Sequence, residues 1–368
     1  MEPNTKASQR FHMKELLISV TSRNEFMVAI ILILTCLFVG HIAPAFWSLA
    51  NLLDIIRTIT VSGIVSMGVL IVVVSGGFDV SFYSIAVFSM FVATKIFTIS
   101  PYSGPIVWII LTSVAIGACL GAINATLINT FKMQPFMTTL GTQNMFRGFL
   151  LAFIGSSYIY NIPKCMVAFS RWTLFSIQTP DGAVFRLQGA ALLFFISAAL
   201  TWFIMTQTML GRSLAAMGGD ADSAERIGLN VKRLNFFLYT YAGALAGLAG
   251  ITYTSLMRLS NPFELVGRET LVLAGVFLGG ARISGGHGTV FGTLMGVTLV
   301  TIINNSLILM GIPTYWQWAV VGSMILVGTG VPSYRAKRRT NRSSVLLSGD
   351  GTGAAVPGGI GTVGGERP

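Results

Sequence analysis

Long apolar runs recur along most of the chain and restrict it to few kinds of fold. A helix needs about 20 consecutive, mainly apolar residues to cross the hydrocarbon core of a bilayer. Hydrophobic residues make up 53% of the sequence and charged residues 10%, whereas soluble domains carry about 25% charged residues. The sequence therefore predicts an all-α, polytopic helical membrane protein with about ten transmembrane helices. We expect spans at residues 26–43, 54–75, 79–98, 105–129, 136–156, 187–208, 235–257, 269–281, 287–310 and 314–332.

Glycines interrupt this pattern near the eighth run. Residues 269–281 are too few to cross a bilayer as one helix. The pairs at 279–280 and 285–286 are both Gly-Gly. We expect a half-helix or re-entrant segment here, with its broken backbone buried in protein. A tilted full helix that starts earlier is the alternative.

The lysines and arginines orient the chain, because cytoplasmic loops retain positive charge. If both termini lie on one side, that side collects most of these residues, so we expect it to be the cytoplasm. The predicted organisation is a cytoplasmic N-terminal segment at 1–25, a transmembrane domain at 26–332 and a disordered cytoplasmic tail at 333–368, rich in Gly, Ser and Thr. The net charge of +11 then reflects topology. Nucleic-acid binding is not expected, because the basic residues are scattered between the spans.

A polar, helix-forming segment at residues 209–234 separates two of the apolar runs. The segment is rich in alanine and punctuated by glycines. A membrane protein that keeps a structured polar helix in one internal loop usually has a soluble partner for it, so we expect a partner to dock here. An ordinary solvated loop is the alternative.

Ionisable residues at membrane depth are costly and often functional. Asp79, Arg147 and Glu269 fit that description. Asp79 comes two residues after the Gly-Gly pair at 76–77 and is expected to cap the next helix. Arg147 is expected to pair with a carboxylate or with the carbonyls at a helix C-terminus. We expect structural or gating roles for all three, and no enzymatic activity, because no catalytic cluster accompanies them. No metal site is expected, since the three histidines are far apart in the sequence.

The chain carries no GxxxxGK[ST] phosphate loop and few membrane carboxylates. These features favour a permease driven by a separate ATPase subunit, which would hold ATP and Mg²⁺, so no cofactor is expected on this chain. An ion-coupled carrier or channel, which would need membrane carboxylates or unwound carbonyl sites, is an alternative. A membrane-embedded enzyme is the third possibility.

Small residues at 242–250 include Gly243 and Gly247, which form a GxxxG pair typical of close helix packing.

The chain resembles the membrane permease subunits of bacterial ABC importers for ribose and related simple sugars, a group that includes autoinducer-2 permeases. The resemblance extends from about residue 51 to residue 332. Matching segments occur in order at residues 51–52 with Arg57, 75–81, 140–148, 211–212, 242–250 and 278–293.

The resemblance implies a multi-pass protein of the bacterial inner membrane with both termini cytoplasmic. It implies three partners: a cytoplasmic ABC ATPase subunit, a periplasmic solute-binding protein, and a second permease copy or a paralogue. The polar segment then looks like the family's coupling helix. The residues expected to couple to the ATPase are Gly211, Arg212, Gly218, Ala224, Glu225 and Gly228. Asp220 stands where the family commonly has Asn, and Glu225 where it often has Arg.

Polar residues within the spans are candidates for the translocation pathway. They are Asn124, Asn144, Asn304, Asn305 and Gln317. Each could equally join membrane helices through hydrogen bonds. The related importers of branched-chain amino acids share the general design and are the alternative function. Glu269 matches a family Glu near the external mouth, whereas Leu271 replaces the Asp often found two residues later.

Overall fold

The computed structural model describes residues 24–99, 102–178 and 184–313, with residues 315, 316, 318–320, 322, 323, 326 and 330. Contacts divide the chain into a first unit of residues 1–325 and a second unit of residues 326–368. The fold below is that of the first unit. The expected tail, nearly all of the N-terminal segment and much of the span at 314–332 lie outside the described residues.

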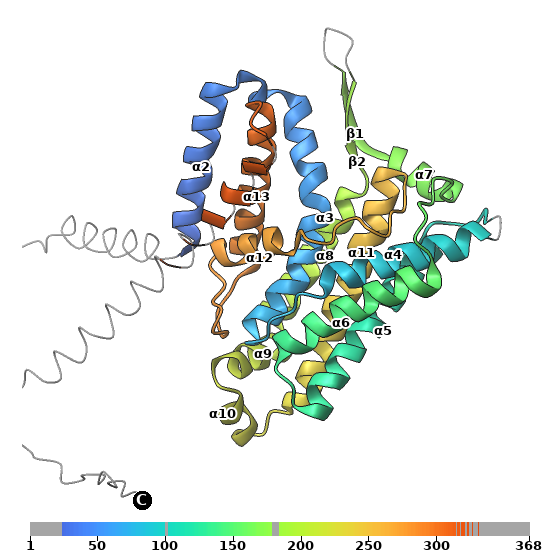
Figure 1. Cartoon of the computed structure of the whole chain (residues 1–368). Coiled ribbons are helices and arrows are strands. Elements are labelled where there is room, and N and C mark those ends of the chain that lie inside the picture. The colour runs from blue at the N-terminus through green and yellow to red at the C-terminus, as the bar shows by residue number, and fades with distance from the viewer. Residues whose placement is uncertain are drawn as a thin grey trace, which may run out of the picture. The chain divides into compact units, whose positions relative to one another are not determined.

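Helices make up almost all of the first unit (Figure 1). They are α2 (Asn24–Ile42), η1 (Pro44–Trp47), α3 (Leu49–Val74), α4 (Phe82–Ile99), α5 (Val107–Phe131), α6 (Pro135–Phe149), η2 (Leu150–Ile154), α7 (Lys164–Arg171), α8 (Ala191–Gln207), α9 (Met209–Gly219), α10 (Ala221–Arg226), α11 (Val231–Met257), α12 (Glu269–Leu278) and α13 (Val290–Leu309). Strands β1 (Thr173–Gln178) and β2 (Val184–Gln188) form an antiparallel hairpin, with Ser176 opposite Arg186.

Among the described residues, six helices are long and apolar enough to cross a membrane: α2, α3, α4, α5, α11 and α13. A seventh span results if α8 and α9, which are bent by 74° at their junction, count as one. The expected span at 136–156 is split between α6 and the π-helical turn η2. Helix α12 has ten residues, in agreement with the short run at 269–281. The chain is thus a polytopic helical membrane protein.

Helix α3 is the centre of the first unit. Its residues are buried almost without interruption from Ile59 to Val74. An α-helix that is apolar on all sides must be covered on all sides, and α3 packs against α8, α11, α12 and α13. Its N-terminal part, by contrast, carries the exposed Asp54 and the half-buried Arg57. The charged residues of α3 therefore lie in its N-terminal part.

Glycines let α5 and α11 approach each other closely. A Cβ atom at Gly243 would lie 2.3 Å from the carbonyl oxygen of Gly117, and a Cβ at Gly247 would lie 2.3 Å from that of Ser113. The Ser113 hydroxyl donates a hydrogen bond to the Gly247 carbonyl at 2.8 Å. The GxxxG pair of α11 therefore forms a helix-packing surface against α5.

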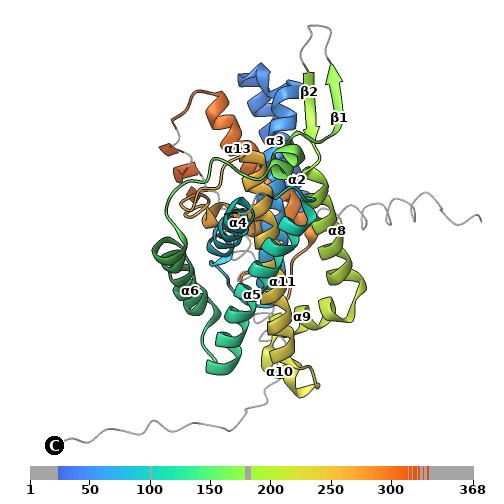
Figure 2. The same cartoon turned by 90° about the vertical axis from the view of Figure 1, so that its right-hand side faces the viewer.

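The two ends of the bundle differ in structure. The hairpin and the connection between α2 and α3 lie at one end, and α9 and α10 lie at the other (Figures 1 and 2). The sequence predicted only a loop before residue 187, so the hairpin was not foreseen, and α8 begins at Ala191 because the preceding residues belong to β2. The bundle thus carries different short elements at its two ends, the hairpin at one and α9 with α10 at the other.

Candidate functional site

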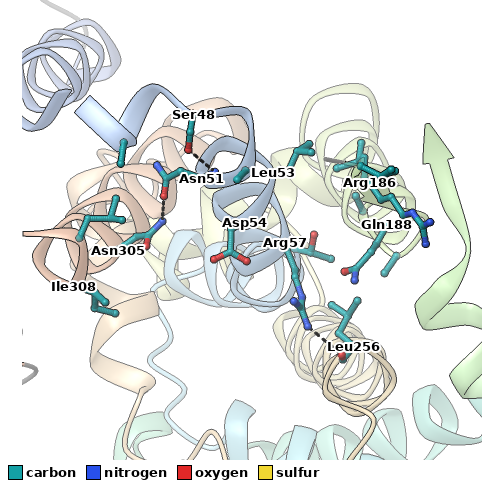
Figure 3. Close-up of a pocket in the computed structure, with 18 residues that line it drawn as sticks. Ser48, Asn51, Leu53, Asp54, Arg57, Arg186, Gln188, Leu256, Asn305 and Ile308 are labelled. Atoms are coloured by element: carbon teal, nitrogen blue, oxygen red, sulfur yellow. Dashed lines mark hydrogen bonds between the residues drawn. The ribbon is translucent and has the colours of Figure 1, made fainter. Parts of the chain in front are cut away.

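A cavity of about 600 Å³ lies at the hairpin end, among α3, β2 and the adjoining ends of α8, α11 and α13. We call it the outer cavity. Its apolar wall includes Leu53, Leu187, Leu256 and Ile308. The polar side chains that line it are Ser48, Asn51, Asp54, Arg57, Thr60, Arg186, Gln188 and Asn305, and all of these but Thr60 are labelled in Figure 3.

One part of the polar lining is held by its own hydrogen bonds. Ser48 caps α3 by accepting from the Asn51 N–H at 3.2 Å. The Asn51 side chain donates to the Phe46 carbonyl at 2.9 Å. Asn305 of α13 donates to Asn51 Oδ1 at 2.8 Å. These bonds join α3, η1 and α13, so this wall of the outer cavity is fixed.

The other part of the lining retains unpaired polar atoms. Arg57 Nη2 donates to the Leu256 carbonyl at 3.1 Å. Arg57 Nε and Gln188 Oε1 are buried, and within the described parts of the chain they have no hydrogen-bond partner. Asp54, one helical turn before Arg57, is exposed (Figure 3). Buried polar groups are normally paired. This side of the cavity therefore differs from the side formed by Asn51 and Asn305, whose side chains bond to each other.

The predicted pathway residues do not gather in one place. Asn305 lines the outer cavity. Asn144 and Asn304 each donate at 3.0 Å to a carbonyl four residues earlier in their own helix. Asn124 is buried and binds a side chain between α3 and α4. Gln317 lies outside the described residues. The structure therefore brings one of the five residues to the cavity and does not describe another.

Asp79 belongs to a buried hydrogen-bonded chain. Its Oδ1 atom accepts from the N–H and the hydroxyl of Ser81, both at 2.7 Å. Asn124 of α5 donates to the Ser81 hydroxyl at 2.8 Å. Asp79 thus stabilises the turn that leads into α4 by accepting hydrogen bonds from Ser81, the residue before the helix. Through Ser81, the turn is also linked to Asn124 of α5.

Glu269 begins α12 and is buried. It accepts a hydrogen bond from Gln143 Nε2 at 3.0 Å and interacts electrostatically with Arg147. Both partners lie on α6. The carboxylate neighbour expected for Arg147 is therefore Glu269, and the group joins α6 to α12.

The predicted coupling residues fall into two sets. Gly211, Gly218 and Ala224 are buried within the chain, and Arg212, Glu225 and Gly228 are exposed. The sequence alone did not distinguish the sets. Only the exposed set, with neighbours such as Ile227, is placed to contact another protein directly.

Asp220 separates the two helices of the polar segment. It caps α10 by accepting from the N–H groups of Asp222 and Ser223, at 3.1 and 3.3 Å. Hydrogen bonds from the Ser223 hydroxyl and N–H lower the pKa of this carboxyl, and the Asp222 N–H adds to the effect. Asp220 therefore fixes the turn between α9 and α10.

Gly218 packs against two other turns of the backbone. A Cβ atom there would lie 1.9 Å from the Val74 carbonyl oxygen and 2.7 Å from the Gly286 nitrogen. The Gly286 N–H donates to that same Val74 carbonyl at 2.8 Å. Gly76, Gly285 and Gly286 all have positive φ, which glycine adopts readily. We call these four glycines the glycine junction. It connects the polar segment to the end of α3 and to the loop before α13.

Comparison with known proteins identifies transport permeases in each case. A family model described as "Branched-chain amino acid transport system / permease component" matches residues 51–328. The chain is similar to the ribose import permease protein of Bacillus subtilis (strain 168), with 32% identity over 307 residues, covering 80% of this chain and 88% of that protein. The D-allose transport system permease protein of Escherichia coli (strain K12) is 29% identical over 303 residues, covering 82% of this chain and 89% of that protein.

A further relative is the galactose/methyl galactoside import permease protein of Salmonella typhimurium (strain LT2). It is 29% identical over 311 residues, covering 80% of this chain and 90% of that protein. No solved structure matches the chain significantly. The similarity therefore covers most of both chains in each of these pairs.

Proposed function

The chain belongs to the family of branched-chain amino acid transport system permease components, and we propose that it is the transmembrane subunit of an ATP-binding-cassette importer that carries a simple sugar across the bacterial inner membrane. The observation that carries the proposal is the match, over at least 80% of this chain, to two import permeases named for ribose and for galactose/methyl galactoside and to a transport system permease named for D-allose. The family description names branched-chain amino acids, which are the second candidate substrate class.

The outer cavity has groups that can bind a sugar. Carboxylate, guanidinium and amide groups line one side of it. Such groups can donate to and accept from hydroxyl groups. The charged groups of a branched-chain amino acid could also pair with Asp54 and Arg57, with its side chain on the apolar wall. The choice of a sugar over an amino acid therefore rests on the relatives named for sugars.

The other end of the bundle supports an ATP-driven mechanism. In this proposal the exposed side of α9 and α10, with Arg212, Glu225 and Ile227, seats on a cytoplasmic ATPase that binds ATP and Mg²⁺. The buried Gly218 links the same segment to α3 and the α12–α13 loop through the glycine junction. Movement of the ATPase would thus reach two membrane segments. A periplasmic solute-binding protein would deliver the sugar, and a second permease copy or a paralogue would complete the pathway.

The experiment is purification of the tagged chain from its native membrane in mild detergent, with identification of the copurifying proteins. We expect an ABC ATPase and a solute-binding protein. Radiolabelled D-ribose, D-allose, D-galactose and L-leucine are then tested for ATP-dependent uptake by cells that make the whole importer. Uptake of L-leucine, without uptake of any of the three sugars, would show that the substrate is a branched-chain amino acid. Transport by the purified chain without an ATPase would contradict the importer.

A further inference from the structure

We propose that Asp54, Arg57 and Gln188 form a subsite of the outer cavity that hydrogen-bonds adjacent hydroxyl groups of a neutral sugar as it enters the membrane domain. The inference rests on the proposed function and adds the residues that discriminate between solutes. All three side chains line one cavity, two from α3 and one from β2 (Figure 3). The subsite is thus assembled from segments far apart in the sequence.

The hydrogen-bonding groups complement a pair of sugar hydroxyls. An ionised carboxylate only accepts, a guanidinium only donates, and an amide does both. Each sugar hydroxyl can donate once and accept. Asp54 and Gln188 Oε1 therefore offer acceptors, and Arg57 offers a donor. Hydrogen bonds with one charged partner are the stronger kind, so Asp54 and Arg57 would provide most of the attraction.

Two of these groups have unused hydrogen-bonding capacity. Arg57 Nε and Gln188 Oε1 are buried and unpaired among the described residues, whereas Asn51 and Asn305 in the same lining bond to each other. An unpaired buried polar atom is unfavourable and calls for an explanation. The terminal torsion of glutamine is soft, so the Gln188 amide can turn into the cavity towards a hydroxyl group.

The size of the cavity suits a monosaccharide, and its charged groups can bind hydroxyl groups. Arg57 and Arg186 line it together with the carboxylate of Asp54, so the lining offers charged donors and a charged acceptor to a hydroxylated solute. The volume of about 600 Å³ lies within the range of small-molecule sites. Leucine and isoleucine side chains complete the wall and suit the C–H faces of a sugar ring.

The test compares uptake of a parent sugar with uptake of its mono-deoxy analogues. Cells making the whole importer receive D-ribose, D-allose or D-galactose, and then the analogues of whichever sugar is imported. In Gln188→Leu, we expect the preference for the parent over at least one analogue to fall by about threefold to tenfold, as for one lost hydrogen bond. Asp54→Asn should lower the preference in the same direction. Membrane abundance is measured for each variant.

Gln178→Leu is the matched control, because Gln178 is exposed on β1 of the same hairpin and does not line the cavity. In Gln178→Leu, the preference for the parent sugar over its deoxy analogues should equal that of the unaltered chain. If Gln188→Leu lowers abundance, Gln188→Glu provides the isosteric variant. A preference unchanged in Gln188→Leu, Gln188→Glu and Asp54→Asn, while the unaltered importer takes up a sugar, overturns the subsite alone. Failure of the unaltered importer to take up any of the three sugars overturns the proposed function and the subsite with it.

Discussion

Gly218 shows how much one backbone position contributes to the link between the polar segment and the spans. The motif match placed it among the residues that couple to an ATPase, and the structure shows it enclosed by its own chain. Adding any side chain therefore acts first on internal packing. A large substitution such as Gly218→Arg would disturb the glycine junction as well as a docking surface, so smaller changes are needed to separate the two effects.

Gly218→Ala is expected to destabilise the solubilised protein by about 1–3 kcal/mol, the usual range for overpacking. The cause is the Cβ atom, which would lie 1.9 Å from the Val74 carbonyl oxygen. Thermal unfolding in detergent measures the effect. Gly219→Ala is the control, since a Cβ at Gly219 meets no described atom within 4 Å. Equal stability of the two variants would contradict the packing seen at the glycine junction.

Asp220 is expected to make the start of α10 sensitive to acid. Its pKa is lowered in the folded state by hydrogen bonds, first from the Ser223 side chain and then from the Ser223 backbone. A carboxyl with a lowered pKa stabilises the fold above its unfolded-state pKa of about 3.9, and the contribution is lost as the pH falls through the folded-state value. Hydrogen-exchange protection of α10 should therefore be constant near neutrality and decline in acid.

Asp220→Asn provides the comparison for this effect. Asparagine caps helices as well as aspartate does but does not titrate. The variant should keep the protection of α10 near pH 7. In acid, its protection should decline less than that of the unaltered protein. An identical acid response in both proteins would assign the pH dependence to another group.

At the scale of whole helices, the close approach of α5 and α11 depends on glycine residues. Gly243→Ala would place a Cβ 2.3 Å from the Gly117 carbonyl oxygen, so the two helices must separate. We expect a loss of about 1–3 kcal/mol in stability, read from thermal unfolding. Gly141→Ala on α6 should have no such effect, because a Cβ there meets no described atom within 4 Å. A similar loss for both would mean that helix separation is not the cause.

The apolar runs predicted most of the helices because membrane burial is encoded locally, over about 20 residues. Helix α3 and the short α12 follow directly from their runs. The bend between α8 and α9 and the hairpin at β1 and β2 were not predicted. The hairpin depends on pairing between segments on either side of residues 179–183, for which the short, mixed sequence gives a weak signal.

The site was less predictable than the spans, because it is formed between elements. Gly-Gly pairs were visible in the sequence at 76–77, 218–219 and 285–286, but their convergence required the fold. Asn305 was selected as one of several polar span residues, and the geometry alone placed it in the outer cavity. Arg186 and Gln188 were missed as cavity residues, because they belong to a strand that looked like a loop.

At the scale of the assembly, the exposed tip of the polar segment is expected to determine partner binding. Ile227 follows α10 and is 76% exposed, an unusual position for a large apolar side chain near several charged residues. Ile227→Asp should reduce ATPase recovery with the tagged chain, because a charge would replace an apolar contact. Met133→Asp is the control for adding a charge elsewhere, because Met133 lies between α5 and α6 and is 45% exposed. Equal recovery with both variants would exclude Ile227 from the contact.

The orientation of the whole chain gives the last prediction. Positive charge favours the cytoplasm for the side that carries the polar segment, and the hairpin lies at the other end of the bundle (Figure 1). In a chain with Cys36, Cys119 and Cys165 replaced by alanine, a membrane-impermeant maleimide added to intact spheroplasts should label Gln178→Cys. It should label Ala221→Cys only after the membrane is opened. Both positions are exposed in the protein, so access depends on the side of the membrane. The reverse pattern would place the outer cavity in the cytoplasm, where a solute delivered from outside could not enter it.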